Sequence, residues 1–219
     1  MKKIFILLLT SLFLFSCTSK NEQTNTQTWN TVIEQQKTIL ALWDSLTAWL
    51  WVDVSDNYPS KLEKKLTQNW YKYKVVNAWV SWDTSDWLKS RVWLYLEPKP
   101  DIVILVIWGN DWLRWLSTSD LKTNIIEIID AFPPTTKIVL WWMDIPMNLW
   151  PKYRNEFKSI YKEIKKEKEN IYLIDYFLEW VWWVRELNNS DKIHPNSAWY
   201  DIVVNNLYNF LIKNNILEK

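Results

Sequence analysis

The chain has 219 residues, a length typical of one domain rather than two. Hydrophobic residues make up 48% of it, which is enough for a buried core and too much for a disordered chain. The formal net charge is +1, so no overall charge favours binding to nucleic acid. One Cys and one His exclude a disulfide scaffold and argue against a zinc site with several ligands, and we expect neither a metal nor a cofactor.

Two residue counts are unusual. Gly occurs once, whereas ordinary usage of roughly 7% would give about 15, and Trp, a rare residue, occurs 19 times. The two counts together are close to an ordinary glycine content with a few tryptophans. We therefore hypothesise that most Trp positions are glycine in the protein made by its host, as when UGA codons read here as Trp are decoded there as Gly. The alternative is a Trp-rich surface whose indoles stack on sugars or aromatic ligands.

The first residues have the pattern of an export signal. A start with two lysines is followed by an apolar run over 4–15, which is too short to span a bilayer comfortably. Ser16 then precedes the only Cys, Cys17, and this stretch resembles a bacterial lipoprotein box, which implies lipidation of Cys17. We expect residues 1–17 to be a lipoprotein-type signal peptide, with an ordinary secretory signal as the alternative.

The segment 18–36 is polar and rich in Thr, Asn and Gln, as in a tether. Residues 37–219 are expected to form the single folded domain. We expect the mature chain outside the cytoplasm, anchored to a membrane by its lipid or, alternatively, secreted or periplasmic. A monomer without a nucleic-acid partner is expected.

Apolar runs and amphipathic segments alternate from Lys37 onward. The run 101–107 is nearly continuous and rich in β-branched residues, as in a strand covered on both faces. Five strands are predicted, at 38–42, 74–77, 101–107, 137–140 and 171–174. Five helices are predicted, at 58–68, 85–96, 119–132, 153–168 and 197–212. This alternation predicts an α/β fold with a parallel sheet between two layers of helices, and ligand sites outside the carboxyl ends of its strands.

Several Trp positions lie where the backbone turns sharply. Trp70 follows the end of a predicted helix, where a left-handed conformation favours Gly. Indoles directly after strands would crowd the backbone and overpack the layer beneath. The glycine hypothesis predicts UGA codons at six such positions, namely Trp43, Trp79, Trp82, Trp108, Trp141 and Trp142.

Four polar blocks follow the predicted strands or precede the last helix. They are Trp43-Asp44-Ser45-Leu46, Ser81-Trp82-Asp83-Thr84-Ser85, Trp108-Gly109-Asn110-Asp111 and Asp191-Lys192-Ile193-His194-Pro195. Read with Gly for Trp, the chain resembles the SGNH (GDSL) hydrolase family over about 38–211, and more narrowly the bacterial acyl-CoA thioesterase I/lysophospholipase L1 group. The resemblance implies the SGNH hydrolase fold, a three-layer α/β/α sandwich with a flavodoxin-like parallel sheet of about five strands.

The resemblance assigns Ser45 as nucleophile, His194 as general base and Asp191 as the carboxylate that orients the imidazole. It assigns the oxyanion hole to the backbone N–H groups of Ser45 and Trp82 and to the Asn110 side chain. Independently of any family, His194 is the only imidazole in the chain that could activate a serine. A lone His beside Pro is otherwise a surface loop residue.

The residues around this set are expected to support it without taking part in chemistry. Asp83 and Asp111 are expected to form hydrogen bonds near the site, and Asp44 to cap a helix. The segments 112–117 and 146–152 are expected to flank an acyl pocket, lined by Trp112, Leu113, Pro146 and Leu149. A literal Trp82 would tolerate positive φ poorly, and its ring could fill the cleft.

The leading functional hypothesis is a serine esterase that acts on ester or thioester bonds of lysophospholipids, acyl esters or arylesters. Location outside the cytoplasm argues against cytosolic acyl-CoA as its physiological substrate. One alternative is a carbohydrate O-deacetylase of the same family, and another is a non-catalytic binding lipoprotein with a surface of real tryptophans. A nucleotide site at Trp49-Leu50-Trp51, read as Gly-Leu-Gly, lacks a third glycine and has little support.

Overall fold

The computed structural model describes residues 36–43, 53–106, 109–142, 151–174, 184–187 and 196–219. All of them belong to one compact unit, Gln35–Lys219. The predicted signal peptide, Cys17 and all but the last residue of the predicted tether lie outside the described residues. None of the described helices is both long and apolar enough to cross a membrane.

Five parallel strands form one sheet in the order β2-β1-β3-β4-β5. They are β1 (Lys37–Trp43), β2 (Tyr73–Asn77), β3 (Ile102–Val106), β4 (Lys137–Trp141) and β5 (Ile171–Ile174). Each predicted strand bound lies within one residue of the observed one. The order changes direction between β1 and β3, as in flavodoxin-like sheets, and the predicted α/β fold is confirmed.

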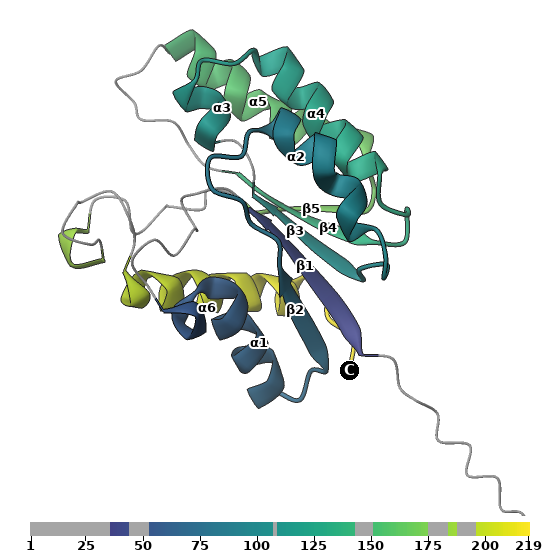
Figure 1. Cartoon of the computed structure of the whole chain (residues 1–219), viewed down its shortest axis with the longest axis vertical. Coiled ribbons are helices and arrows are strands. Elements are labelled where there is room, and N and C mark those ends of the chain that lie inside the picture. Colours follow the sequence, from purple (N-terminus) through teal and green to yellow (C-terminus); the bar gives the residue numbers. More distant parts are fainter. Residues whose placement is uncertain (1–35, 44–52, 107–108, 143–150, 175–183, 188–195) are drawn as a thin grey trace, which may run out of the picture. The chain divides into compact units, whose positions relative to one another are not determined.

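Helices cover both faces of the sheet (Figure 1). On one face α1 (Tyr58–Gln68) packs against α6 (Ser197–Lys213), and on the other α4 (Thr118–Asp130) packs between α2 (Ser85–Arg91) and α5 (Pro151–Glu167). The predicted helix 85–96 is shorter than expected, since α2 continues as the 3-10 segment η3 (Val92–Tyr95). Three short elements were not predicted: η2 (Val54–Asp56), α3 (Gly109–Leu113) and η4 (Arg185–Leu187).

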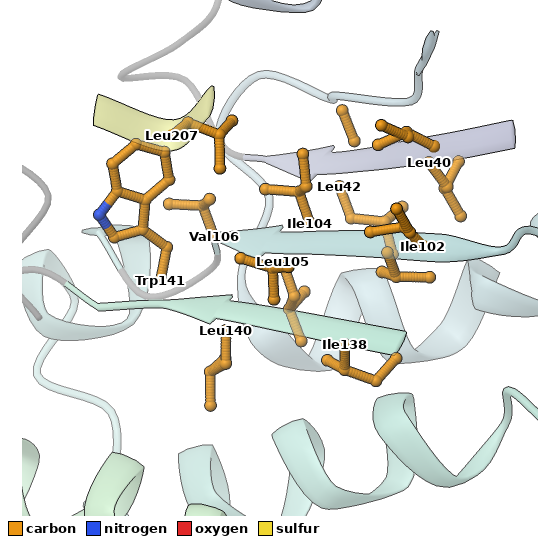
Figure 2. Close-up of a cluster of buried hydrophobic side chains, with 14 of the residues drawn as sticks. Leu40, Leu42, Ile102, Ile104, Leu105, Val106, Ile138, Leu140, Trp141 and Leu207 are labelled. Atoms are coloured by element: carbon orange, nitrogen blue, oxygen red, sulfur yellow. The ribbon is translucent and has the colours of Figure 1, made fainter. Parts of the chain in front are cut away.

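The core fills both sides of the central strands. All five residues of β3 are buried, as a strand covered on two faces requires, and side chains of β1, β3 and β4 meet Leu207 of α6 in Figure 2. On α5 the apolar positions at i, i+3, i+4 and i+7 all face this core, namely Phe157, Ile160, Tyr161 and Ile164. Burial of these apolar stripes holds the helices against the sheet.

Four described residues other than Gly have positive φ, and three of them are Trp. Two of these Trp follow helix ends: φ is 65° at Trp70 after α1 and 54° at Trp115 after α3. In each case the next N–H returns to a helix carbonyl, Tyr71 N to Leu66 O at 3.0 Å and Leu116 N to Asp111 O at 2.9 Å. This is the Schellman motif, in which the left-handed residue is usually Gly.

The third such Trp lies in the loop after β2. Trp82 has a φ of 66° and is the third residue of a turn closed by a hydrogen bond from Asp83 N to Val80 O (3.4 Å). A positive φ at this position of a turn favours Gly or Asn over bulky residues. The backbone therefore favours glycine at positions 70, 82 and 115.

The other Trp residues that the structure describes do not have a positive φ, so their backbone does not favour Gly. Trp141 and Trp142 are buried at the end of β4, where Trp141 lies beside Val106 (Figure 2) and the Trp142 ring stacks on Tyr161 with centroids 6.0 Å apart. Neither has a positive φ. The assignment of glycine to most Trp positions stays a prediction, supported by the backbone at three of them.

We predict that Trp70→Gly raises the free energy of unfolding by about 1 kcal/mol. The left-handed conformation costs a residue with a side chain roughly 1–2 kcal/mol, and a Trp70 side chain that is 85% exposed has little packing to lose. A shift of the denaturant midpoint at constant slope measures the change.

The matched control is Trp93→Gly. Trp93 is 67% exposed but lies in η3 and has no positive φ, so its replacement should leave stability unchanged or lower it by up to about 1 kcal/mol. Equal effects of the two substitutions would contradict the interpretation of position 70.

Candidate active site

The candidate site lies at the carboxyl ends of β1, β2 and β3. Ala41 pairs with Asn77 and Trp43 with Val106, so the chain leaves these strands at one edge of the sheet. The segments after β2 and β3 carry two of the four polar blocks. The other two blocks fall largely or wholly in 44–52 and 188–195, so Ser45, Asp191 and His194 lie outside the described residues.

Polar side chains are concentrated beside this edge. Eight polar residues are buried in the described part of the chain, and six of them form what we call the polar cluster: Asp83, Thr84, Ser85, Asn110, Asp111 and Asn124. Buried polar groups destabilise a fold unless they are hydrogen-bonded. Their concentration at one place therefore indicates a site with a role beyond packing.

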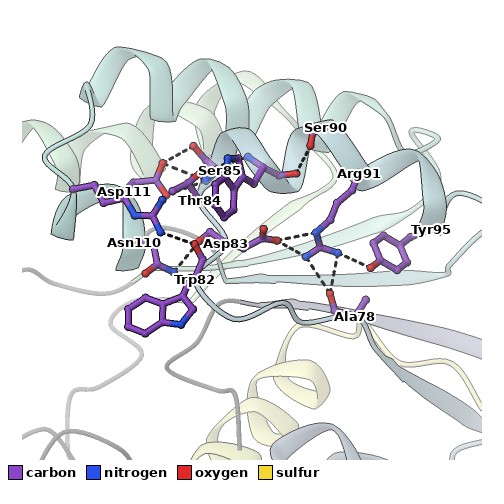
Figure 3. Close-up of polar contacts among 12 residues, drawn as sticks. Ala78, Trp82, Asp83, Thr84, Ser85, Ser90, Arg91, Tyr95, Asn110 and Asp111 are labelled. Atoms are coloured by element: carbon purple, nitrogen blue, oxygen red, sulfur yellow. Dashed lines mark hydrogen bonds and ion pairs between the residues drawn. The ribbon is translucent and has the colours of Figure 1, made fainter. Parts of the chain in front are cut away.

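Asn110 connects the segment after β3 to the segment after β2 (Figure 3). Its side chain is 2% exposed, and its Nδ2 donates a hydrogen bond to the Asp83 carbonyl oxygen at 2.9 Å. Because a carbonyl oxygen can only accept, this bond fixes which end of the amide faces residue 83. The nitrogen carries two hydrogens, and this bond uses one of them.

The structure brings the two described members of the predicted oxyanion hole together. Trp82 directly precedes Asp83, whose carbonyl holds Asn110, and the Trp82 carbonyl accepts a hydrogen bond from Arg114 Nη2 at 3.2 Å. The indole of Trp82 is 58% exposed beside this contact. Position 82 and the Asn110 side chain therefore lie close together, and their assignment to an oxyanion hole stays a prediction because Ser45 lies outside the described residues.

Arg91 of α2 fixes the loop that leads to residue 82. Its Nε donates to Asp83 Oδ2 at 2.8 Å, and its Nη2 also contacts that oxygen. The same guanidinium donates to the Ala78 carbonyl at 3.3 Å and to the Tyr95 hydroxyl (Figure 3). The two ends of the segment 78–83, which contains the turn around Trp82, are thus attached to one side chain.

Asp111 is the second buried carboxylate of the cluster. Its oxygens accept hydrogen bonds from Ser85 N (2.9 Å) and Ser85 Oγ (2.6 Å), and Asn124 Nδ2 donates to the same Ser85 Oγ at 3.0 Å. Ser85 is the first residue of α2, so Asp111 also satisfies a helix N–H that has no partner within the helix.

Burial and hydrogen bonding act in opposite directions on the two carboxyl groups. Burial raises the pKa of Asp83 and of Asp111 above the ordinary Asp value because it disfavours the charged form. The Arg91 guanidinium opposes the rise of the Asp83 pKa, and the hydrogen bonds from Ser85 oppose that of the Asp111 pKa.

Part of this network was not predicted. Asp83 and Asp111 are hydrogen-bonding residues as expected, whereas Arg91 and Asn124 were not singled out from the sequence. Asn124 lies on the buried face of α4 among apolar residues. A polar residue in an apolar helical stripe is the signal that could have identified it.

The acyl-pocket residues are only partly described. Trp112 is half-buried against the core, and Leu113 is exposed at the end of α3. Pro146 and Leu149 lie outside the described residues. Within the described ranges, no group of three or more His, Cys, Asp or Glu side chains is arranged to hold a metal ion.

Comparison with known proteins places the chain in a family. The model of the GDSL-like lipase/acylhydrolase family matches residues 41–202. Esterase TesA from Pseudomonas aeruginosa is 32% identical over 174 residues, which are 78% of this chain and 86% of that protein. An arylesterase from Vibrio mimicus is 27% identical over 189 residues, or 85% and 88% of the two chains.

The fold agrees with these relatives. The crystal structure of TesA matches with a TM-score of 0.74 and 32% identity, covering 80% of this chain and 98% of its own. The family match runs from β1 into α6 and includes the whole polar cluster. The chain therefore belongs to the GDSL-like lipase/acylhydrolase family, and it is a hydrolase that acts on ester bonds.

Proposed function

We propose that the chain is a serine esterase that cleaves carboxylic esters or thioesters of acyl substrates, such as lysophospholipids, acyl esters or arylesters. The proposed triad is Ser45, His194 and Asp191. The proposed oxyanion hole consists of the backbone N–H groups of Ser45 and residue 82 and of the Asn110 side-chain amide.

One observation carries this proposal. The Asn110 amide is buried, oriented by the Asp83 carbonyl and adjacent to residue 82, and this fixed side-chain amide at the edge of the sheet supports the proposed role as an N–H donor. β1 lies between β2 and β3 in the sheet, and Ser45 follows the last residue of β1 by two positions. Fixed donors beside a serine are what acyl transfer requires.

The proposed reaction has two halves. Ser45 Oγ attacks the acyl carbonyl carbon while His194 takes its proton, and the electron pair of the C=O bond moves to oxygen, where the N–H donors stabilise it. The tetrahedral intermediate then expels the alcohol or thiol, which takes the proton from His194. Water attacks the acyl-Ser45 ester with His194 again as base, and the carboxylic acid leaves as Ser45 recovers its proton.

We assign the substrate only to a chemical class, acyl esters or thioesters. Leu113 offers exposed apolar surface at the end of α3, which suits an acyl chain longer than acetyl. A carbohydrate O-deacetylase would instead prefer acetyl esters. Rates on p-nitrophenyl acetate and octanoate, normalised to active sites, separate the two possibilities.

We predict that a serine-directed organophosphate modifies Ser45 and that His194→Ala lowers esterase turnover by about four to six orders of magnitude. Without the imidazole, the serine hydroxyl has no base to take its proton. Peptide mass mapping identifies the labelled residue, and Ser55→Ala, in η2, is the control that should keep full turnover. Wild-type turnover in His194→Ala would end the proposed mechanism.

A second prediction concerns the oxyanion hole. Asn110→Ala should lower kcat by about 100- to 1000-fold, because one fixed donor to the transition state is lost. KM should change little, since the oxyanion forms only during reaction. Asn206→Ala removes an exposed amide on α6 and should leave kcat unchanged. Equal kcat values for the two variants would remove Asn110 from the site.

We further propose that the chain is exported and held at a membrane through lipidated Cys17. The support is the sequence pattern of residues 1–17 alone. Cys17→Ser should move the protein from the membrane fraction to the soluble extracytoplasmic fraction, as measured by fractionation of the expressing cells. A variant that stays in the membrane fraction would contradict lipid anchoring.

A further inference from the structure

The segment 83–85 and the helix α3 are joined by hydrogen bonds that run in opposite directions. Asn110 of α3 donates to the Asp83 carbonyl at 2.9 Å, and the next residue, Asp111, accepts from Ser85 N at 2.9 Å and Ser85 Oγ at 2.6 Å (Figure 3). One hydrogen bond would allow the two segments to pivot about it. Attachment at two points two residues apart fixes their relative orientation as well.

We propose that Asp111 is a positioning residue of the oxyanion hole, which it holds in place through Ser85. The inference rests on the proposed function, because it concerns the same site. Asp111 acts on Asn110 in two ways, as its neighbour on α3 and through the segment that accepts the Asn110 amide. If Asp111 released Ser85, the Asp83 carbonyl would be free to shift, and the Asn110 N–H would lose its fixed direction.

The side chains around Asp111 are buried and hydrogen-bonded to one another. Asp111 is 1% exposed and Ser85 is 0% exposed, so neither side chain can exchange its partner for water without rearrangement. Asn124 of α4 donates to Ser85 Oγ at 3.0 Å, which leaves the hydroxyl hydrogen to point at Asp111. The carboxylate thus receives two donors from Ser85: the N–H, which is fixed by α2, and the hydroxyl, which is oriented by Asn124.

Arg91 and Asp111 attach to different residues of the loop that contains residue 82. Arg91 contacts Ala78, which precedes residue 82, and Asp83, which directly follows it. Asp111 holds Ser85 on the far side of residue 82 along the chain. The segment that carries the backbone N–H of residue 82 is therefore attached on both sides, and only the Asp111 attachment shares a helix with Asn110.

The test is Asp111→Asn in the full chain, with Asp86→Asn as the matched control. Asn has the shape of Asp, but its side-chain NH2 group is a donor. In Asp111→Asn this group would face the N–H or the O–H of Ser85, and one hydrogen bond would be lost. Asp86 is in the same turn of α2, its side chain is 64% exposed, and it pairs with Lys89 at 3.3 Å. Both variants remove one negative charge, so they differ in the network and not in net charge.

We expect Asp111→Asn to lower kcat by about 10- to 100-fold while KM stays within about twofold, because a small misplacement of a donor acts on the transition state. Rates are normalised to active sites by organophosphate titration, and urea midpoints report stability. Ser85→Ala keeps the backbone N–H bond to Asp111 and should give a smaller loss of kcat. This variant tests the same positioning role if Asp111→Asn fails to fold. Asp86→Asn should match the wild type.

A readout without turnover separates this inference from the proposed function. The NMR signals of the Asn110 side-chain NH2 group, assigned by their absence in Asn110→Ala, should shift in Asp111→Asn and in Ser85→Ala but not in Asp86→Asn. Unshifted signals, or a kcat that stays at the wild-type value while the urea midpoint falls, would overturn the positioning role. Shifted signals in a chain without esterase activity would uphold the positioning and overturn the proposed function instead.

Discussion

The site depends on contact between two segments that do not leave the sheet as neighbours. β1 lies between β2 and β3, so Asn110 and the Asp83 carbonyl must meet across the end of β1. A parallel sheet makes this possible because its strands end at one edge, and the change of direction between β1 and β3 opens that edge to a ligand. The fold therefore places the oriented Asn110 amide at the edge of the sheet where β1 ends.

The polar cluster explains why a buried carboxylate is kept where an apolar residue would cost less to bury. Asp83 and Asp111 both lose water, and each regains hydrogen bonds from donors of fixed direction, a guanidinium in one case and Ser85 in the other. Apolar packing could fill the same space, but it has no preferred direction. Orientation of a single amide is the property that hydrogen bonds supply and packing does not.

Local patterns in the sequence were sufficient for the sheet and the long helices. The continuous apolar run over 101–107 and the i, i+3, i+4 spacing on α5 identify β3 and α5 to within two residues at each end. A five-residue helix such as α3 is too short to show a period, and an apolar pattern does not separate α2 from the 3-10 turn that follows it. Ordered motifs drew attention to Asn110 and residue 82. The partners of Ser85 are 26 and 39 residues away, so no local pattern indicates that Asp111 and Asn124 meet at this residue.

The backbone conformation of residue 82 bears on both the proposed glycine at this position and the proposed oxyanion hole. Its φ of 66° aims the following carbonyls at Arg114 and Asn110, so a change to negative φ would break the contacts that orient the amide. Trp in this conformation carries a cost of roughly 1–2 kcal/mol and leaves a large ring at the edge of the sheet where the proposed site lies. Glycine carries neither. The conformation observed at this member of the proposed oxyanion hole is thus the one that a residue without a side chain adopts most easily. The proposed glycine at position 82 and the proposed oxyanion hole are therefore compatible.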